Sequence, residues 1–299
     1  MKAQKTLLLI VGPTAIGKTS LSIALAKHFD TSIVSVDSRQ LYKEMSIGTA
    51  KPSEEERGGI PHYFIDSHSI QEEYTAGQYE YDFLATATKI FEEKDILIAV
   101  GGSGLFVKAI CDGFDDIPSD MTIRNEIMTR LDKEGIEKLQ EELKKVDPDY
   151  YASNDIHNTH RLVRALEVFH LTQKPISSFQ TGKKKERPFN IIKIGLTMDR
   201  ELLYQRINLR VDDMMKMGLL EEIKTLLPYK HLNALQTVGY QEFWDYFEHK
   251  RSIEEAVELV KRNTRRFAKR QLTWFKRDDD IHWYTAEEAF ANSIKHLAC

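Results

Sequence analysis

The feature that most constrains this 299-residue chain is a glycine-rich motif near its start. It follows an apolar run, Leu7–Val11, and precedes an amphipathic stretch, Ser20–Lys27. The pattern G-x-x-x-x-G-K-T of a phosphate loop is met by Gly12, Pro13, Thr14, Ala15, Ile16, Gly17, Lys18 and Thr19. A strand, a glycine-bearing turn and a helix start in this order bring backbone N–H groups together around an anion. The alternative is a chance glycine turn, but the flanking pattern favours a di- or triphosphate site.

Two side chains of this loop add to its backbone N–H groups. Lys18 supplies a positive charge, and the hydroxyl of Thr19 can hold a Mg²⁺ ion that bridges the phosphates. We therefore expect Mg²⁺ as the cofactor, bound to the protein mainly through the phosphate groups.

Composition excludes several classes of protein. The chain has 41% hydrophobic and 29% charged residues and a net charge of −4, which argues against a globally basic nucleic-acid binder. Its cysteines, Cys111 and Cys299, allow no disulfide framework and no C-x-x-C metal site. The start, Met1–Thr6, lacks the features of a signal peptide, and no apolar run reaches membrane-spanning length. We expect a cytoplasmic protein with no membrane partner.

Alternation of apolar runs and helical patterns predicts the fold. Long helical patterns cover Arg200–Leu227 and Ser252–Phe275. The candidate strands are Leu7–Val11, Ser32–Val36, Ile96–Val100 and Ile191–Thr197. This order is typical of an α/β protein with a P-loop core of doubly wound parallel sheet.

A helical segment interrupts the predicted core before its fourth strand. Apolar residues recur at helical spacing within Ile123–Lys145 and within His157–Thr172. These residues are Ile123, Ile127, Leu131, Leu162, Ala165, Leu166 and Phe169. We predict a helical insertion domain over 115–190, with 1–114 and 191–299 forming the catalytic core.

Polar residues follow two of the predicted strands. Asp37 comes directly after the second strand, beside the phosphate loop in a right-handed β-α-β unit. Its carboxylate could hold Mg²⁺, act as a general base or cap a helix. The third strand is followed by paired glycines and Ser103, whose hydroxyl would face the same site. No strand ends in the Asp-Glu pair expected of a phosphate-hydrolysing ATPase, which favours group transfer over hydrolysis.

A basic segment lies near the end of the chain. Lys261–Arg277 contains eight bases and no acidic residue. One broad helical stripe is formed by Arg262, Arg266, Lys269 and Arg270. In a chain of negative net charge, such a stripe is typical of a surface that binds a phosphate backbone. The alternative is a solvated helix face whose bases pair with acids such as Glu254, Glu255 and Glu258.

In their order along the chain, these motifs resemble those of the bacterial tRNA dimethylallyltransferases, also called tRNA isopentenyltransferases. Besides the phosphate loop, the resemblance rests on Ser35–Tyr42, Ile47–Pro52, Pro61–Tyr63, Val100–Gly104, Arg161–Glu167, Val238–Tyr240 and Thr264–Phe275. It covers nearly the whole chain. The string Gly-Thr-Ala-Lys-Pro within Ile47–Pro52 is highly specific, whereas a phosphate loop alone would not be.

The resemblance implies a prenyl transfer. Its donor would be dimethylallyl diphosphate, and its acceptor the N6 amine of adenosine 37 in tRNAs that read codons beginning with U. Asp37 matches the family's general base, and Lys18, Thr19 with Mg²⁺, and Arg210 would stabilise the departing diphosphate. Ser103 matches a family position usually held by Thr, near the bridging oxygen, and we expect its retained hydroxyl to keep that role.

The resemblance also implies a monomer whose insertion domain clasps the anticodon stem-loop of tRNA. The target base must leave the stack to reach the site. The predicted tRNA contacts, the basic stripe included, are Asp37, Ser38, Arg39, Gln40, Ser103, Arg124, His160, Arg161, Leu162, Val163, Arg164, Gln236, Thr237, Val238, Gly239, Tyr240, Gln241, Arg262, Arg266, Lys269 and Arg270. The chain departs from the family pattern at His160, where Gln is common, and at Gln236 and Gln241, where bases often stand.

Three other functions share parts of this pattern. An adenylate prenyltransferase would attach the same group to free AMP, ADP or ATP, but the insertion and the basic stripe favour a large polyanionic acceptor. A P-loop small-molecule kinase, with ATP as donor, leaves the motifs after residue 47 unexplained. A non-catalytic RNA-binding module would not need an intact Lys18, Thr19 and Asp37.

Overall fold

The structure, a computed structural model, describes residues 4–298, so Cys299 lies outside the described residues. The chain divides into two compact units. Met1–Cys111 and Glu186–Cys299 together form the first, here called the core unit. Asp112–Lys185 form the second, here called the insertion unit, which covers nearly the same residues as the insertion predicted from the sequence.

The core unit is built on a parallel sheet whose strand order is β3-β2-β4-β1-β5-β6. Its strands are β1 Thr6–Val11, β2 Ile33–Val36, β3 His62–Tyr63, β4 Ile96–Gly101, β5 Asn190–Leu196 and β6 Ile281–Tyr284. All six residues of β1 are buried, which explains its uninterrupted apolar sequence, because a central parallel strand is covered on both faces. The predicted α/β fold is confirmed.

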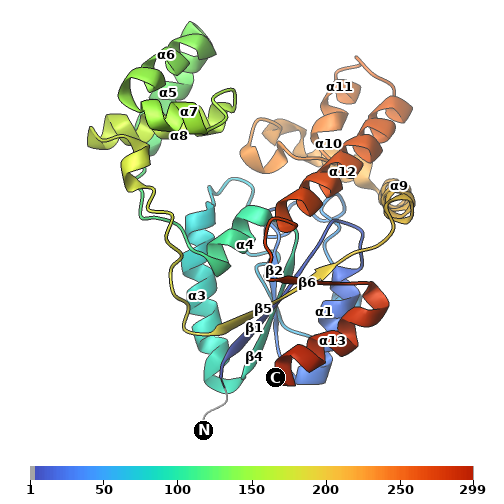
Figure 1. The fold of residues 1–299 in the computed structure, drawn as a ribbon. Coiled ribbons are helices and arrows are strands. Elements are labelled where there is room, and N and C mark those ends of the chain that lie inside the picture. Colours follow the sequence, from blue (N-terminus) through green and yellow to red (C-terminus); the bar gives the residue numbers. More distant parts are fainter. Residues whose placement is uncertain (1–3, 299) are drawn as a thin grey trace. The chain divides into compact units, whose positions relative to one another are not determined.

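Helices cover both faces of this sheet. Figure 1 shows α1 and α13 on one face, and α3 and α4 on the other. The α-helices of the core unit are α1 Lys18–Phe29, α2 Glu54–Arg57, α3 Ala76–Glu93, α4 Gly104–Cys111, α9 Arg200–Lys216, α10 Leu219–Leu226, α11 Trp244–Phe247, α12 Ile253–Phe275 and α13 Ala286–Ala298. Leu8 and Ile10 of β1 pack with Leu25 of α1 in one hydrophobic cluster.

Short 3₁₀ turns connect several of the helices of the core unit. They are η2 Leu227–Tyr229, η3 Asn233–Leu235 and η4 Gln241–Phe243. The helical pattern expected over Arg200–Leu227 is interrupted at Gly218, which has a φ of 98° and separates α9 from α10. Glycine adopts this left-handed conformation without the steric penalty that other residues incur.

The insertion unit is a small helical bundle. It contains α5 Met121–Glu134, α6 Ile136–Val146, α7 Pro148–Ser153, α8 Thr159–Thr172 and the 3₁₀ turn η1 Ile176–Phe179. Its hydrophobic core includes Ile127, Leu162 and Leu166, which the sequence pattern placed on the apolar faces of its helices. The segment Ile123–Lys145 is two helices rather than one, because Gly135, with a φ of 84°, stands between them.

Among residues 4–298, no helix combines the length and the apolar character needed to cross a membrane.

Candidate functional site

The phosphate loop follows the central strand β1 and ends in α1. Gly12 and Gly17 have φ values of 146° and 106°, which favour glycine at both positions. A Cβ atom on Gly12 would also lie 3.1 Å from the backbone oxygen of Leu196 in β5. The side chain of Lys18 turns back over the loop, and its Nζ donates hydrogen bonds to the backbone oxygens of Gly12 and Pro13 at 2.9 and 2.8 Å.

The buried ammonium of Lys18 has no carboxylate partner among the described residues. Burial lowers its pKa to about 8, and the charge of Arg210 lowers the pKa further, whereas that of Asp37 raises it. A buried cation beside the backbone N–H groups of this loop fits a bound phosphate group, which would favour the charged form of the lysine.

Two arginines of α9 extend the positive charge around the loop. The Arg210 guanidinium lies 3.5 Å from the hydroxyl of Thr14, and burial followed by the nearby charge of Arg206 lowers the pKa of Arg210. A Cβ atom on Gly17 would lie 3.9 Å from Nη2 of Arg206, so this side chain also borders the loop. Arg206 was not among the residues predicted from the sequence, although its position one helical turn before Arg210 indicates that both face the same side.

Asp37 lies directly after β2 and takes part in a tight turn. Its Oδ1 accepts hydrogen bonds from the backbone N–H groups of Arg39 at 2.9 Å and Gln40 at 3.3 Å. The capping alternative is therefore partly met, since one carboxylate oxygen stabilises local backbone. The second oxygen, Oδ2, has no hydrogen-bond partner within residues 4–298 and is available to a substrate.

The ends of β2 and β4 are held very close together. A Cβ atom on Gly101 would lie 2.0 Å from the backbone oxygen of Val36, so only glycine fits there. The backbone N–H of Ser103 donates to the same oxygen at 3.2 Å. Asp37 and Ser103, which follow these two residues, are therefore positioned at one edge of the sheet, beside the phosphate loop.

A buried glutamine of α12 joins the phosphate loop to the end of β4. The Oε1 atom of Gln271 accepts a hydrogen bond from the backbone N–H of Thr14 at 2.9 Å, and its Nε2 donates to the backbone oxygen of Gly102 at 2.9 Å. The residue is 6% exposed. No sequence pattern predicts this residue, because the recognisable pattern of α12 is its charged face and Gln271 lies on the opposite, buried side.

The loop after Asp37 is tied to the core by side-chain contacts. The Gln40 amide donates to the backbone oxygens of Thr49 and Ala50, at 3.2 Å each. Burial lowers the pKa of Arg39, while contacts with Tyr42 and Asp37 oppose that shift. Ser38 through Gln40 thus form an ordered rim beside Asp37.

Two of the motifs that carried the family resemblance meet around Glu222 of α10. Its carboxylate accepts hydrogen bonds from the backbone N–H groups of Ser46, Ile47 and Gly48 and from the hydroxyl of Tyr240. A Cβ atom on Gly48 would lie 2.5 Å from the Tyr240 ring. The predicted tRNA-contact segment Gln236–Gln241 is thus anchored by a buried tyrosine, while Gln236 and Gln241 themselves are exposed.

The opposite face of α12 carries the predicted basic stripe. Arg262, Arg266, Lys269 and Arg270 are all exposed, and none of them forms an ion pair with a described residue. Glu255 is instead used in the N-terminal capping box of the helix. The alternative of a face neutralised by nearby acids therefore applies only to Lys261, which pairs with Asp212 and Glu258.

In the insertion unit, the predicted RNA-contact residues have different surroundings. Arg124 and Arg164 both pair with the fully buried carboxylate of Glu167, so part of each guanidinium holds the helices together. The side chains of Leu162 and Val163 are buried in the hydrophobic core. His160 and Arg161, near the N-terminus of α8, are exposed.

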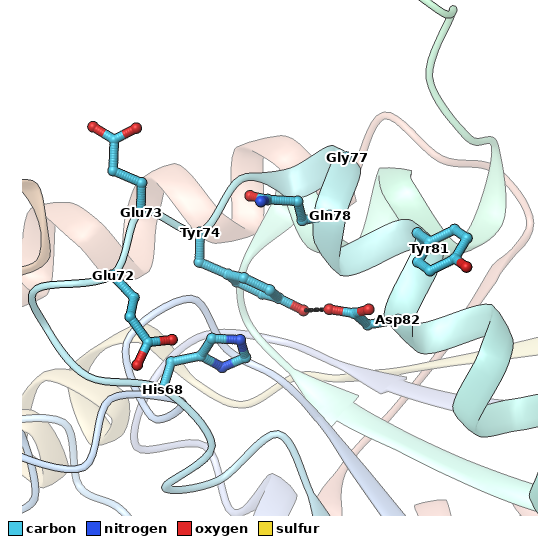
Figure 2. Close-up of a pocket in the computed structure, with 8 residues that line it drawn as sticks. All are labelled: His68, Glu72, Glu73, Tyr74, Gly77, Gln78, Tyr81 and Asp82. Carbon is cyan, nitrogen blue, oxygen red and sulfur yellow. Dashed lines mark hydrogen bonds between the residues drawn. The ribbon is translucent and has the colours of Figure 1, made fainter. Parts of the chain in front are cut away.

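A pocket of about 460 Å³ lies on another part of the core unit, at the start of α3 (Figure 2). The Tyr74 hydroxyl in its wall donates to Asp82 at 2.8 Å, and the ring of His68 lies 4.0 Å from that of Tyr74. Its lining is His68, Glu72, Glu73, Tyr74, Gly77, Gln78, Tyr81 and Asp82. Three carboxylates and no lysine or arginine make this pocket unfavourable for a diphosphate.

No group of three or more His, Cys, Asp or Glu residues in the described part of the chain is arranged to hold a metal ion. A Mg²⁺ ion in the loop would therefore depend mainly on phosphate oxygens. The Thr19 hydroxyl, at the start of α1, has no hydrogen-bond partner among residues 4–298 and fits the role of the single protein ligand predicted for it.

Comparisons with known proteins agree on one family. Residues 40–278 match the family model described as IPP transferase. The tRNA dimethylallyltransferase of Flavobacterium johnsoniae is 53% identical over 287 residues, covering 94% of this chain and 93% of the relative. That of Christiangramia forsetii is 49% identical over 289 residues, covering 96% of each chain.

Solved structures give the same result. The tRNA isopentenylpyrophosphate transferase of Bacillus halodurans is 35% identical with a TM-score of 0.72, and the match covers 99% of this chain and 98% of that one. A eukaryotic dimethylallyltransferase acting on tRNA has a TM-score of 0.81 at 28% identity, covering 98% of this chain and 77% of that one.

Proposed function

This chain belongs to the IPP transferase family, and from that premise we propose that it transfers the dimethylallyl group of dimethylallyl diphosphate to an adenosine base of tRNA. The acceptor atom in this proposal is the exocyclic N6 amine of adenosine 37, in the anticodon stem-loop of tRNAs that read codons beginning with U. The observation that carries it is the placement of one carboxylate, Asp37, beside a phosphate loop whose buried Lys18 has no carboxylate in ion-pair contact.

The loop side of the site fits the leaving group. In the transfer, a C–N bond forms to the allylic carbon while its C–O bond breaks, and negative charge develops on the departing diphosphate. Lys18, Arg210 and Arg206 surround the loop, so their positive charges would stabilise the departing diphosphate more strongly than the donor, which carries one negative charge less. Ser103 would hold the bridging oxygen through its hydroxyl.

The Asp37 side fits the acceptor. The N6 lone pair is delocalised into the purine, so the amine attacks more readily if its proton is removed as the C–N bond forms. The free Oδ2 of Asp37 would accept that proton, while Oδ1 keeps the carboxylate in place through the N–H groups of Arg39 and Gln40. Mg²⁺ bound to the diphosphate beside Thr19 would supply further neutralisation of its charge.

The basic face of α12 supports a nucleic-acid acceptor. Its unpaired cations, with Phe267 and Trp274 exposed at 38% and 41% on the same helix, match the mixture of charge and aromatic rings that binds RNA. We propose that this face and the exposed start of α8 contact the anticodon stem-loop.

Because one chain supplies both the donor loop and the basic face, we also propose that the protein acts as a monomer. We propose that it acts in the cytoplasm, where its tRNA acceptor is found.

The deciding experiment offers the protein two acceptors. Purified protein is incubated with dimethylallyl diphosphate, Mg²⁺ and either an unmodified anticodon stem-loop with three consecutive adenosines or free AMP. Nucleoside mass spectrometry then detects the added prenyl group. We expect a mass gain on the stem-loop adenosine alone.

Each other outcome identifies a different enzyme. Gain on AMP alone would place the protein among adenylate prenyltransferases. Gain on neither acceptor, together with ATP-dependent phosphorylation of a small alcohol, would identify a kinase.

Size-exclusion chromatography with light scattering tests the proposal that the protein is a monomer, and a measured mass of two chains would contradict it.

A further inference from the structure

We propose that Gln271 is a positioning residue that holds the phosphate loop and the Ser103 segment in one fixed relation, from the helix that carries the basic face. The inference rests on the proposed function, because it assigns the two segments to the leaving diphosphate. The charged pattern of α12 does not indicate a role for this residue. The role is inferred from its two hydrogen bonds.

The Gln271 amide bridges two backbone groups that no other described side chain connects. Its oxygen accepts from the N–H of Thr14 in the phosphate loop, and its nitrogen donates to the carbonyl of Gly102, directly before Ser103. Both bonds are 2.9 Å long, and the side chain is almost completely buried. Thr14 and Gly102 lie 257 and 169 residues away along the chain.

The fit around this amide is close. A Cβ atom on Gly102 would lie 2.2 Å from Nε2 of Gln271 and 3.4 Å from the backbone oxygen of Gly12. Glycine at this position therefore makes room for the amide and lets the end of β4 approach the start of the loop. The bridge needs one acceptor and one donor at a fixed spacing, which only an amide of this length supplies.

The bridge has a consequence for anion binding. Because the N–H of Thr14 is already bonded to Gln271, the donors left for a diphosphate come from the later part of the loop and the first turn of α1. Gln271 thus sets the direction in which the loop opens. It also links Ser103 to the phosphate loop, so that the proposed contacts to the bridging oxygen and to the rest of the diphosphate keep a fixed spacing.

The position on α12 ties this support to the RNA-binding face. Arg270 precedes Gln271, and because neighbouring residues of a helix point about 100° apart, Arg270 is exposed while Gln271 is buried. Trp274 follows within one turn, and its indole packs against the backbone of Gly104. A single rigid helix therefore carries the proposed RNA contacts on one face and the bridge to the diphosphate loop on the other.

The test separates donor positioning from RNA contact. Gln271→Leu removes both bonds at similar size, and Gln271→Glu keeps the acceptor for Thr14 but sets a carboxylate oxygen against the Gly102 carbonyl. Thr88→Val is the matched control, because Thr88 is exposed on α3 and its hydroxyl bonds only to the backbone oxygen of Leu84 in the same helix. Isothermal titration with inorganic diphosphate and Mg²⁺ measures the loop without turnover, and steady-state kinetics give KM for donor and for tRNA separately.

We expect both Gln271 variants to bind Mg²⁺–diphosphate about tenfold or more weakly, with a matching rise in donor KM and with KM for tRNA within about twofold of the wild type. Thr88→Val should change neither constant. A purely structural role would lower the unfolding temperature without this split. If Gln271→Leu does not fold, the nearly isosteric Gln271→Glu gives the decision.

Two results would overturn the proposal: unchanged diphosphate affinity in both variants, or a rise confined to KM for tRNA, which would make Gln271 an RNA contact. Failure of the proposed function is recognised separately, because the wild-type protein would then bind Mg²⁺–diphosphate but would not prenylate the stem-loop.

Discussion

Asp37 divides its two carboxylate oxygens between structure and chemistry, and a pair of substitutions can separate these roles. Asp37→Asn keeps an oxygen to accept from Arg39 and Gln40 but cannot take a proton, whereas Asp37→Ala loses both functions. We expect both variants to lower kcat by about 10² to 10⁴, the usual range for a general base, with tRNA affinity largely kept. Single-turnover prenylation of the stem-loop measures the effect.

Comparing the turnover of the two variants separates the catalytic role of Asp37 from its role in the turn. If Asp37→Asn retained wild-type turnover while Asp37→Ala lost it, the residue would serve only to hold the turn. If both retained it, Asp37 would have no part in the reaction. Thermal unfolding of both proteins shows how much stability the turn contributes.

The lowered pKa of Lys18 predicts how donor binding depends on pH. In the free protein the lysine is charged below pH 8 and increasingly neutral above it, because burial brings its pKa down to about 8. A bound diphosphate favours the charged form, so binding above pH 8 must take up a proton. Affinity for Mg²⁺–diphosphate should therefore be constant below pH 8 and fall by up to about tenfold per pH unit above it.

Titration calorimetry between pH 7 and 9.5 measures this dependence. Lys18→Met, measured over the same range, accounts for ionisation of the diphosphate itself and should bind weakly with no break near pH 8. An identical pH profile for the two proteins would show that Lys18 does not titrate in the site.

The sequence predicts the residues that belong to a short local motif or directly follow a recognisable strand. Lys18 and Thr19 belong to such a motif, and Asp37 follows an apolar strand. Gln271 could not be predicted, because its role depends on two backbone groups that are distant along the chain. The buried pairing of Arg124 with Glu167 was equally hidden, since no local spacing relates residues from two different helices.

At the scale of elements, α12 presents two faces with separate tasks. Buried positions such as Ala268 and Phe275 pack into the core unit, while Arg266 and Arg270 remain exposed and without ion pairs among the described residues. We expect Arg266→Glu combined with Arg270→Glu to weaken tRNA binding and to reduce its salt dependence by about one to two units of the log–log slope. Diphosphate affinity should not change.

Filter binding or fluorescence anisotropy at several salt concentrations measures the loss. The matched control reverses two exposed lysines elsewhere on the core unit, Lys89 of α3 and Lys295 of α13, which gives the same net charge. Equal weakening in both double variants would mean that only total charge matters. Unchanged binding in the α12 variant would show that its basic face is merely solvated.

The elements that sequence patterns predicted well are the long or fully buried ones. The run Leu7–Val11 and the segment Ser252–Phe275 differ from β1 and α12 by only one residue. Prediction failed at Gly135 and Gly218, where a helical pattern continues across a residue with positive φ. Strands β3 and β6 were missed because they are short, lie at the sheet edges and have no full apolar pattern.

At the scale of the whole molecule, the chain leaves the core unit and returns to it at neighbouring points. The Arg187 side chain donates to the backbone oxygens of Ala109 and Ile110 and pairs with Glu80, all within the core unit. Within the insertion unit, the N–H of Lys185 donates to the backbone oxygen of Asp112 at 2.7 Å. Outgoing and returning segments therefore lie side by side.

This adjacency predicts that the insertion can be removed. Replacement of 112–185 by a short Gly-Ser linker should leave a folded core that binds Mg²⁺–diphosphate, because each unit has its own hydrophobic cluster. Prenylation of the stem-loop should fall sharply, since the exposed start of α8 is lost. Circular dichroism and calorimetry on the shortened protein check the first point, and an unfolded or aggregated product would contradict it.

The sheet order also governs how the chain can fold while it is being synthesised. Thr6 of the central strand β1 pairs with Ile96 on one side and with Asn190 on the other. At roughly 5–20 residues per second, translation from the first of these strands to the last takes on the order of 10 to 40 s. Throughout that interval the edge of β1 that pairs with β5 has no neighbour, although the phosphate loop has long left the ribosome. The nascent protein must keep the unpaired backbone groups of this apolar strand from pairing with other chains, so slower initiation or chaperone assistance should raise the yield of native enzyme.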